Sequence, residues 1–350
     1  MTKNTNHKIL VTGGTGYIGS HTVVELQNQG YEVYIIDNLS NSNISVLDGI
    51  EKITGIRPVF EKIDLCDKAK LKKFFKKYNG ITSVIHFAAY KTVVESVQKP
   101  LKYYRNNIIA LINLLEEINL NNINNLIFSS SCTVYGQPDK LPVDENAPTK
   151  KANSPYGYTK QVCETIINDT IISQDNFKAI ALRYFNPIGA HNSAFIGELP
   201  IGTPYNLVPC ITQTAFGIQK QIKVYGNDYN TPDGSCIRDY INVVDLAKAH
   251  VVAIERLIKN KNKNNFEVFN IGTGKGVSVL EIINSFERVS HQKVNYKIVE
   301  RRPGDIEKVW ADTSLANKEL GWKSEKLLDE TLLSAWNWEK YYREQQKLKN

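Results

Sequence analysis

The chain has 350 residues, of which 42% are apolar and 23% charged, and its 43 Lys and Arg against 36 Asp and Glu give a formal net charge of +7. The length suggests two domains, or one domain with a sizeable insert, and the modest positive charge is spread along the chain rather than gathered as a nucleic-acid footprint. Since no apolar run approaches 18 residues and the five cysteines show no metal-ligand spacing, we expect a cytoplasmic protein without a membrane span, a metal site or a nucleic-acid partner.

Short apolar runs alternate with helical patterns through the first half of the chain. Runs such as ILV, VYII and SVIHFAA are almost entirely apolar, as strands buried on both faces are. The alternation predicts an α/β fold, a Rossmann-type doubly wound parallel sheet with helices on both faces. The predicted strands are Lys8–Thr12, Glu32–Ile36, Arg57–Lys62, Ser83–Phe87, Asn124–Ser129 and Phe177–Tyr184.

A glycine cluster lies between the first predicted strand and the first predicted helix. Gly13, Gly16 and Gly19 allow a tight turn and a close approach of the backbone to a pyrophosphate, and the helix N-terminus offers free amides. Asp37 ends the second strand, where a carboxylate can accept both ribose hydroxyls of an adenosine and repel a 2′-phosphate. The pattern therefore predicts NAD rather than NADP; the alternative for Asp37 is an ordinary turn residue.

Three serines end the fifth predicted strand. Ligands bind at the carboxyl ends of parallel strands in such folds, so the last of them, Ser131, can pass a proton between a substrate and a base. A Tyr and a Lys four residues apart follow it, and although that spacing is common on helices, here it comes after the glycine loop, the acid and the serine. The coincidence favours a catalytic site.

The stretch SPYGYTK holds this Tyr–Lys pair at the start of a predicted helix. Ser154 suits the N-cap and Pro155 the first helical position, so Tyr156 and Lys160 share one helix face. The ammonium, the helix dipole and a bound nicotinamide cation all favour a phenolate, and lowering the pKa of Tyr156 from about 10 to about 7 needs roughly 4 kcal/mol. We expect Tyr156 to be a base near neutral pH.

The sequence changes character after about Asn186, where Gly and Pro become frequent and the elements become short. We expect residues 1–186 to form the NAD-binding domain and residues 187–350 to form mainly a smaller, mixed α/β lobe for the substrate. A strand at Glu267–Ile271 is expected to return to the first sheet. Later helices are predicted at Ser278–Val289, Thr313–Leu320 and Leu327–Tyr342.

Nine stretches between Lys8 and Trp338 carry a resemblance: VTGGTGYIGSHT, DNLSNS, ESVQKPLKYYRNN, FSSSCTVYG, SPYGYTK, RYFNPIGAH, VYGNDYNTPDGSCIRDYI, FNIGTGKGVSVLE and RRPGD. The chain resembles the extended short-chain dehydrogenase/reductases and, within them, the UDP-glucose 4-epimerase family. The resemblance implies an isomerase of galactose metabolism that interconverts UDP-galactose and UDP-glucose by C4 oxidation, rotation of the 4-keto sugar and re-reduction with NAD. It also implies a homodimer formed by helices within residues 98–118 and 156–173.

The resemblance further implies the site residues. Those for NAD are Gly13, Gly16, Tyr17, Ile18, Gly19, Asp37, Asn38, Asn41, Ser42, Asp64, Leu65, Phe87, Ala88, Ala89, Tyr90, Lys91, Asn106, Tyr156, Lys160 and Phe185. Those for the UDP-hexose are Ser131, Tyr156, Asn186, Asn206, Leu207, the segment Lys223–Tyr225, Arg238, the turn from Arg302 to Asp305, and Val309, while Tyr156, Lys160 and Ser131 are catalytic. Two arginines suit a diphosphate, and Tyr225 offers an aromatic face for uracil. The chain departs from the family pattern at Cys132, Arg105 and Tyr90.

Two alternatives stay open. A nucleotide-sugar 4,6-dehydratase would need an Asp–Glu pair beside the serine, whereas Cys132, Thr133 and Val134 follow Ser131. An NAD-sensing module without catalysis could dispense with the catalytic side chains, and all of them are present in this chain.

Val309 bears on which sugars fit. Family members restricted to unsubstituted sugars resemble one another in carrying a large Tyr at this position. A Val side chain leaves room for a 2-acetamido group, so we expect UDP-N-acetylgalactosamine to be accepted as well. The alternative is that Val309 is only a core residue before Trp310.

Overall fold

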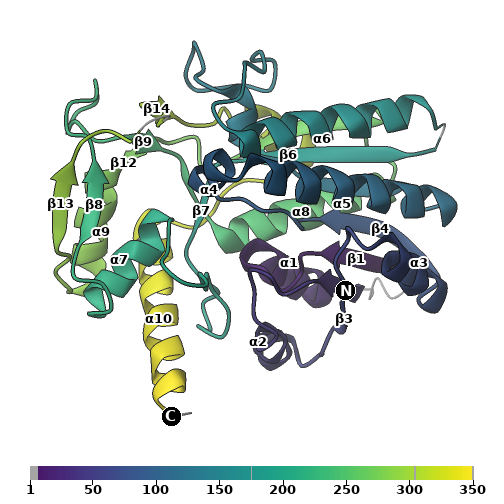
Figure 1. The fold of residues 1–350 in the computed structure, drawn as a ribbon, viewed down its shortest axis with the longest axis horizontal. Helices are drawn as coiled ribbons and strands as arrows, with labels where there is room; N and C mark the ends of the chain where they lie inside the picture. The colour runs from purple at the N-terminus through teal and green to yellow at the C-terminus, as the bar shows by residue number, and fades with distance from the viewer. Residues whose placement is uncertain (1–6, 175, 303–304, 349–350) are drawn as a thin grey trace.

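The computed structural model describes residues 7–174, 176–302 and 305–348. A seven-stranded parallel sheet runs through it in the order β11-β6-β5-β4-β1-β2-β3 (Figure 1), which confirms the predicted fold class. Its strands are β1 (Lys8–Thr12), β2 (Glu32–Asp37), β3 (Val59–Lys62), β4 (Ile81–His86), β5 (Asn125–Ser129), β6 (Lys178–Tyr184) and β11 (Phe266–Ile271). The strand order reverses between β1 and β4, the place where ligands bind in doubly wound sheets.

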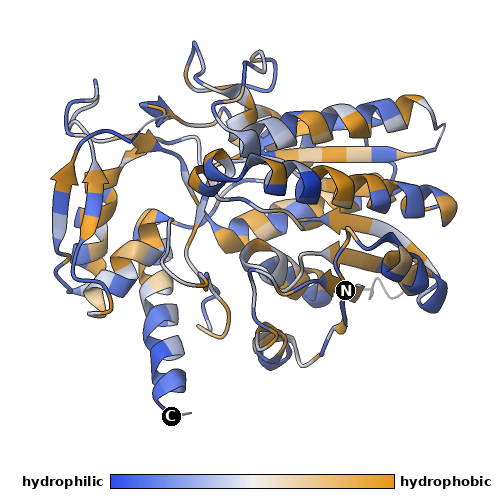
Figure 2. Cartoon of the chain, in the orientation of Figure 1, coloured by the Kyte–Doolittle hydropathy of each residue, from blue (hydrophilic) through white to orange (hydrophobic). Residues whose placement is uncertain are grey.

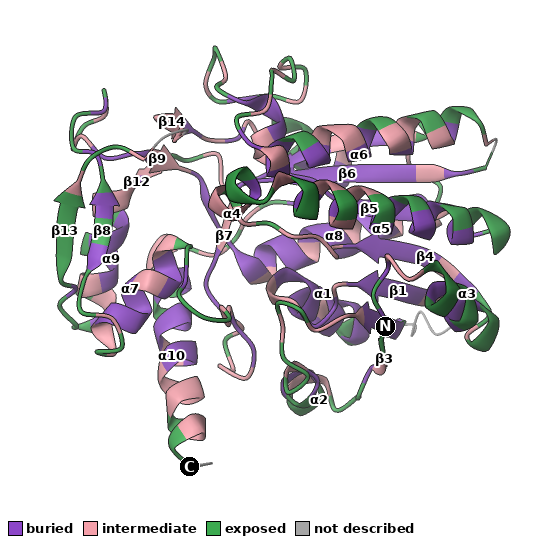
Figure 3. Cartoon of the chain, viewed as in Figure 1, coloured by how far each residue is buried: buried purple, intermediate pink, exposed green. Residues whose placement is uncertain are grey.

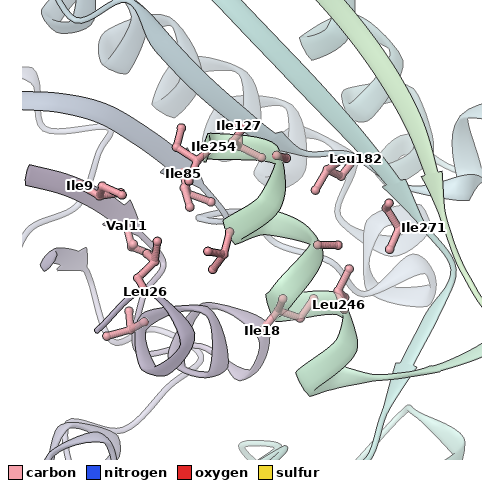
Figure 4. Close-up of a cluster of buried hydrophobic side chains, with 14 of the residues drawn as sticks. Ile9, Val11, Ile18, Leu26, Ile85, Ile127, Leu182, Leu246, Ile254 and Ile271 are labelled. Carbon is pink, nitrogen blue, oxygen red and sulfur yellow. The ribbon is translucent and has the colours of Figure 1, made fainter. Parts of the chain in front are cut away.

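Both faces of the sheet are buried, which explains the continuous apolar runs. Ile9, Leu10 and Val11 of β1 are all fully buried, but Ile9 and Val11 belong to one core and Leu10 to the other. Successive side chains of a strand point to opposite faces, so each strand contributes to both cores. Figure 4 shows Ile9 and Val11 in the first core, facing Leu26.

Helices cover both faces and complete a three-layer arrangement. The first core is closed by α1 (Tyr17–Asn28), α2 (Val46–Thr54) and α8 (Val243–Ile258). The second is closed by α3 (Lys68–Lys77), α5 (Pro100–Leu120) and α6 (Pro155–Ile172). Among the helices of the described residues, none has the length and apolar character needed to cross a bilayer.

Two elements from the second half of the chain complete the main sheet. β11 lies where the sequence predicted a returning strand and pairs with β6 from Phe266 opposite Ala179 to Ile271 opposite Tyr184. Helix α8 packs against α1, and Figure 4 shows its Leu246 and Ile254 among side chains of the sheet and of α1.

The rest of the second half forms a smaller unit with its own core. Ile211, Phe286 and Trp336 belong to that core. Most of the edge strand at Tyr296–Val299 is exposed (Figure 3), although Figure 2 shows that it carries hydrophobic as well as hydrophilic residues. The helices of this unit are α7 (Leu207–Ala215), α9 (Val279–Ser290) and α10 (Leu328–Lys347), and a π-helical turn, η2 (Ala316–Leu320), precedes α10. The short helix α4 (Val93–Gln98) lies in the first half of the chain, after β4. The small sheets of the smaller unit pair β7 (Asn186–Ile188) with β10 (Tyr240–Asn242), β8 (Ile222–Tyr225) with β13 (Tyr296–Val299), and β9 (Ile237–Arg238) with β12 (Val277–Ser278) and β14 (Lys308–Val309).

Candidate active site

The glycine loop joins β1 to α1 and leaves no room for side chains. Gly13 has a φ of 72°, and a Cβ there would lie 2.8 Å from the backbone nitrogen of Ala88. A Cβ on Gly19 would lie 2.3 Å from the carbonyl oxygen of Gly13. Among the described residues, no side chain caps the N-terminus of α1. The loop is therefore a cradle with free amides, and it fits a pyrophosphate.

Asp37 ties the glycine loop to the loop that follows β2. Its carboxylate accepts hydrogen bonds from the amide of Thr15 at 3.3 Å, the amide of Leu39 at 2.8 Å and the hydroxyl of Ser42 at 3.2 Å. Asn38, beside it, donates to the Asp64 carboxylate at 3.2 Å. The structure thus brings together residues from three separate segments that were predicted to hold NAD.

The segment after β4 lies directly against the glycine loop. Asn107, which is buried, receives the amide of Tyr90 at 2.9 Å and donates to the carbonyl of Tyr90 at 3.1 Å and to the hydroxyl of Thr159 at 3.1 Å. It also receives the side-chain amide of Asn106 at 2.9 Å. The sequence analysis assigned Asn106 to the site and missed its neighbour Asn107. The buried side-chain amide of Asn107 needs hydrogen-bond partners, and it finds them in the segment after β4 and on α6.

Tyr156 and Lys160 lie on α6 as predicted, with Ser154 capping the helix. The Ser154 hydroxyl accepts from the amide of Gly157 at 3.2 Å. Tyr156 is 7% exposed and Lys160 is 4% exposed, so both face the interior. The Lys160 ammonium donates to the Ser129 carbonyl at 2.6 Å and lies 6.0 Å from the centre of the Tyr156 ring.

The expected lowering of the Tyr156 pKa relies on a bound nicotinamide cation and stays a prediction, and the protein groups around Tyr156 act in the opposite direction. Burial raises the pKa of Tyr156 well above its ordinary value, the nearby Tyr184 adds to this, and a hydrogen bond with Ser131 only partly opposes it. Burial also lowers the pKa of Lys160 to about 8. Sequence reasoning counted the favourable charges but not the cost of removing a phenolate from water, which is the larger effect here.

Thr133 determines how the Ser131 hydroxyl can be used. Ser131 accepts hydrogen bonds from the Thr133 amide at 3.2 Å and from the Thr133 hydroxyl at 3.0 Å. A hydroxyl has two acceptor positions and one proton, so the proton of Ser131 remains available to donate to a phenolate or a sugar oxygen. Next to it, burial raises the pKa of the Cys132 thiol to about 12, in keeping with the neutral role expected for that residue.

Arg238 and Val309 are neighbours on the substrate side, on the paired strands β9 and β14. Val309 is buried in a small cluster that includes Val134, Tyr135 and Phe185, and Cys132 packs against that cluster. Val309 is therefore a packed core residue, as the alternative interpretation had it, but its cluster adjoins Cys132, the residue after the predicted catalytic serine Ser131.

Arg302 lies over Tyr225, with its guanidinium 5.2 Å from the ring centre, and pairs with Asp305 at 2.7 Å. Three residues assigned to the nucleotide thus lie together; residues 303 and 304 of that turn lie outside the described residues. Lys223 shares β8 with Tyr225, and Asn186 begins β7.

Glu198 is a second residue that sequence reasoning missed. The Glu198 side chain is 12% exposed. Its carboxylate accepts hydrogen bonds from the Lys91 ammonium at 3.3 Å and from the side-chain amide of Asn206 at 2.5 Å. The indole of Trp338 donates a hydrogen bond to the backbone carbonyl of Glu198 at 3.0 Å. It therefore joins a residue assigned to the cofactor to one assigned to the substrate, and a lone Glu in a Gly- and Pro-rich segment gave no signal of this.

Comparisons with known proteins place the chain among its relatives. The family described as GDP-mannose 4,6 dehydratase matches residues 10–334. The UDP-glucose 4-epimerase of Yersinia enterocolitica is 48% identical over 332 residues, which cover 95% of this chain and 97% of that protein.

Two solved structures are also similar. The UDP-glucose-4-epimerase from Stenotrophomonas maltophila with bound NAD and formylated UDP-arabinopyranose has a TM-score of 0.93 and 45% identity, covering 97% of this chain and 99% of that one. The UDP-Glc/GlcNAc 4-epimerase from Campylobacter jejuni has a TM-score of 0.81 and 33% identity, covering 96% of this chain and 99% of that one.

Proposed function

This chain belongs to the family described as GDP-mannose 4,6 dehydratase and, within it, to the UDP-glucose 4-epimerases, and on this premise we propose how its own residues carry out the reaction. It is an isomerase that interconverts UDP-galactose and UDP-glucose by oxidation at C4, rotation of the 4-keto sugar and re-reduction. NAD, when bound, supplies the chemistry of accepting and returning the hydride. The glycine loop, Asp37 and the segment after β4 would hold it.

Tyr156 takes the proton from the 4-hydroxyl of the sugar, and Ser131 donates a hydrogen bond to the oxygen that loses it. The observation that carries this assignment is that Tyr156, near the start of α6, and Ser131, just after β5, are both buried, and that Ser131 acts on the pKa of Tyr156. Burial excludes water, and Lys160 supplies a positive charge one turn along α6. Burial raises the pKa of Tyr156, and the positive charges of Lys160 and of a bound nicotinamide would both favour the phenolate.

Arg238, Arg302, Asn206 and the start of α7 at Leu207 would anchor the nucleotide while the sugar turns over. The test is to incubate the purified protein with UDP-galactose, without added nucleotide, and to identify the products. Formation of UDP-glucose to a constant ratio supports the assignment, whereas a 4-keto-6-deoxy product would favour the dehydratase and no turnover with bound NAD would favour a sensing module.

Acceptance of N-acetylated sugars is a further part of the proposal. The Campylobacter jejuni relative is a UDP-Glc/GlcNAc 4-epimerase, and Val309, beside Cys132 and Ile306, is smaller than a Tyr would be. Incubation with UDP-N-acetylgalactosamine tests this; conversion to UDP-N-acetylglucosamine supports it.

We further propose a cytoplasmic homodimer with a two-domain division at about residue 186, from which α8 and β11 return to the first domain. Exposed apolar side chains on α5 and α6 support the dimer: Leu101 is 77% exposed and Ile172 is 77% exposed, with Ile109, Ile112 and Tyr158 also exposed. Burying such side chains against a second copy would form a four-helix contact. Sedimentation of the purified protein measures the mass, and replacing Leu101 and Ile172 with Glu should yield monomers.

A further inference from the structure

Helix α6 and the end of β5 are joined by two hydrogen bonds in consecutive helical turns. The Lys160 ammonium donates to the Ser129 carbonyl at 2.6 Å, and the Ser130 hydroxyl donates to the Glu164 carboxylate at 2.5 Å. Tyr156, Lys160 and Glu164 are spaced by four residues, so they lie along one face of the helix. Lys160 and Glu164 thus hold two of three consecutive serines, and Tyr156, one turn earlier, is the residue that the third, Ser131, is proposed to assist.

Glu164 is held rigidly from its other side. Arg183, on the neighbouring strand β6, donates to the two carboxylate oxygens at 3.0 and 2.6 Å. The Glu164 and Arg183 side chains are only 9% and 8% exposed, and the Arg183 guanidinium lies 4.9 Å from the centre of the Tyr135 ring. A planar, two-point contact of this kind fixes direction as well as distance.

The third pair in this series is the reacting pair. We propose that Glu164 is a positioning residue that, by holding the Ser130 hydroxyl, sets the separation between Ser131 on the strand and Tyr156 on the helix. The geometry supports it because Ser130 is fully buried and adjacent to Ser131, so a shift of Ser130 would move Ser131 with it. A misplacement of about 1 Å, which is less than the rise of about 1.5 Å per residue of an α-helix, can lower a reaction rate on the order of 10²-fold.

A purely structural role is the alternative for this buried ion pair. Buried pairs contribute little net stability, but removing one partner leaves a buried charge uncompensated and is costly. The two roles differ in what they predict for Ser130, whose hydroxyl can be removed while the Glu164–Arg183 pair stays intact. The inference rests on the proposed roles of Ser131 and Tyr156.

The test compares three variants of the full, NAD-loaded protein. Ser130→Ala removes only the tether. Ser290→Ala is the matched control, since Ser290 is a buried serine that donates one hydrogen bond, to the Phe286 carbonyl at 2.7 Å, in the smaller unit. Glu164→Gln keeps one side-chain oxygen for Ser130 but leaves the charge of Arg183 unpaired.

The measurements are kcat and KM for UDP-galactose, Tm, and the pH profile of kcat. We expect Ser130→Ala to lower kcat about tenfold or more with KM within about twofold, whereas Ser290→Ala keeps wild-type kcat. Glu164→Gln should lose more Tm but less kcat than Ser130→Ala. The acid limb of the profile should move to higher pH in Ser130→Ala, because the hydrogen bond with Ser131 lowers the pKa of Tyr156.

The other titratable groups that face Tyr156 are unchanged in Ser130→Ala: Tyr184 on β6, Cys132 after Ser131, Tyr103 on α5 and Lys160 on α6. If kcat falls in proportion to Tm across all three variants and the pH profile stays in place, Glu164 is merely structural and the inference is wrong. Absence of turnover in the wild-type protein would instead count against the proposed function, so the two failures can be told apart.

Discussion

The Lys91 ammonium lies 3.3 Å from the Glu198 carboxylate. Lys91 follows β4, beside the glycine loop, whereas Glu198 lies between β7 and α7 in the second half of the chain. The same carboxylate holds Asn206, the residue before α7. One charged group therefore fixes a side chain on each side of the proposed site.

Removing this carboxylate should weaken substrate binding without affecting the chemistry. Glu198→Ala is expected to raise KM for UDP-galactose about tenfold, the equivalent of one hydrogen bond to a charged group, and to change kcat less than about threefold. Glu198→Gln keeps an acceptor for Asn206 and should raise KM less. Steady-state kinetics check both, and an unchanged KM in Glu198→Ala would show that Asn206 does not need this partner.

Tyr156→Phe should remove the base and leave the binding sites intact. We expect turnover to fall by on the order of 10² or more, with Tm and NAD content close to those of the wild type. The measurement is the conversion of UDP-galactose by protein whose nucleotide content has been quantified. Wild-type turnover in a folded, NAD-loaded variant would refute the assignment of Tyr156.

Because three histidines are buried, we expect the free energy of unfolding to decrease in mild acid. Burial lowers the pKa of His21 and His86 to about 3 and that of His250 to about 4. The unfolded chain binds protons below about pH 6.5 and the folded chain does not, so stability is complete above pH 6.5 and is lost as the pH falls from 6.5 towards 4. Each histidine contributes up to about 1.4 kcal/mol per pH unit in that range.

Urea unfolding at pH 6.5 and at pH 5.5 measures this loss. The variant His250→Gln should show a decrease smaller than that of the wild type by about one histidine's share. An equal decrease in both proteins would mean that His250 titrates in the folded state near its ordinary pKa.

Asp37 should make the protein selective for NAD. The Asp37 carboxylate is held in place by hydrogen bonds from Thr15, Leu39 and Ser42. A 2′-phosphate would face this negative charge and be repelled. Nucleotide released by denaturing the purified protein should be NAD by mass, and Asp37→Ser should take up NADP more readily. Recovery of mainly NADP from the wild type would contradict this assignment.

The size of the side chain at position 309 should select the sugar. Val309→Tyr is expected to suppress conversion of UDP-N-acetylgalactosamine far more than that of UDP-galactose, because a phenol would fill the space of the acetamido group. Val309 is buried, so Val309→Ala serves as a control for disturbed packing. Equal loss of both activities in Val309→Tyr, or a wild type inactive on the N-acetyl sugar at saturation, would contradict the prediction.

The main sheet and the catalytic pair were predictable because their signals are local. Strand β1 has the predicted bounds, β4 differs by one or two residues at each end, and Ser154 caps α6 as expected. Helix α8 was missed although its sequence is amphipathic and Asn242 caps it; only its packing on α1 depends on partners distant in the sequence. The strands of β9 and β14 are two residues long, too short for any period. Asn107 and Glu198 were missed because their roles depend on partners distant in the sequence.

The order in which the chain leaves the ribosome matters for this fold. Strand β6 acquires its outer neighbour only when residues 266–271 have been made, and the apolar face of α1 is covered by α8, at residues 243–258. A fragment ending at residue 186 would keep every residue of the glycine loop and the Tyr–Lys pair, yet present an open strand edge and a bare helix face. Such a fragment should self-associate rather than fold. Nascent chains of this protein therefore depend on protection from aggregation until at least three quarters of the sequence has emerged.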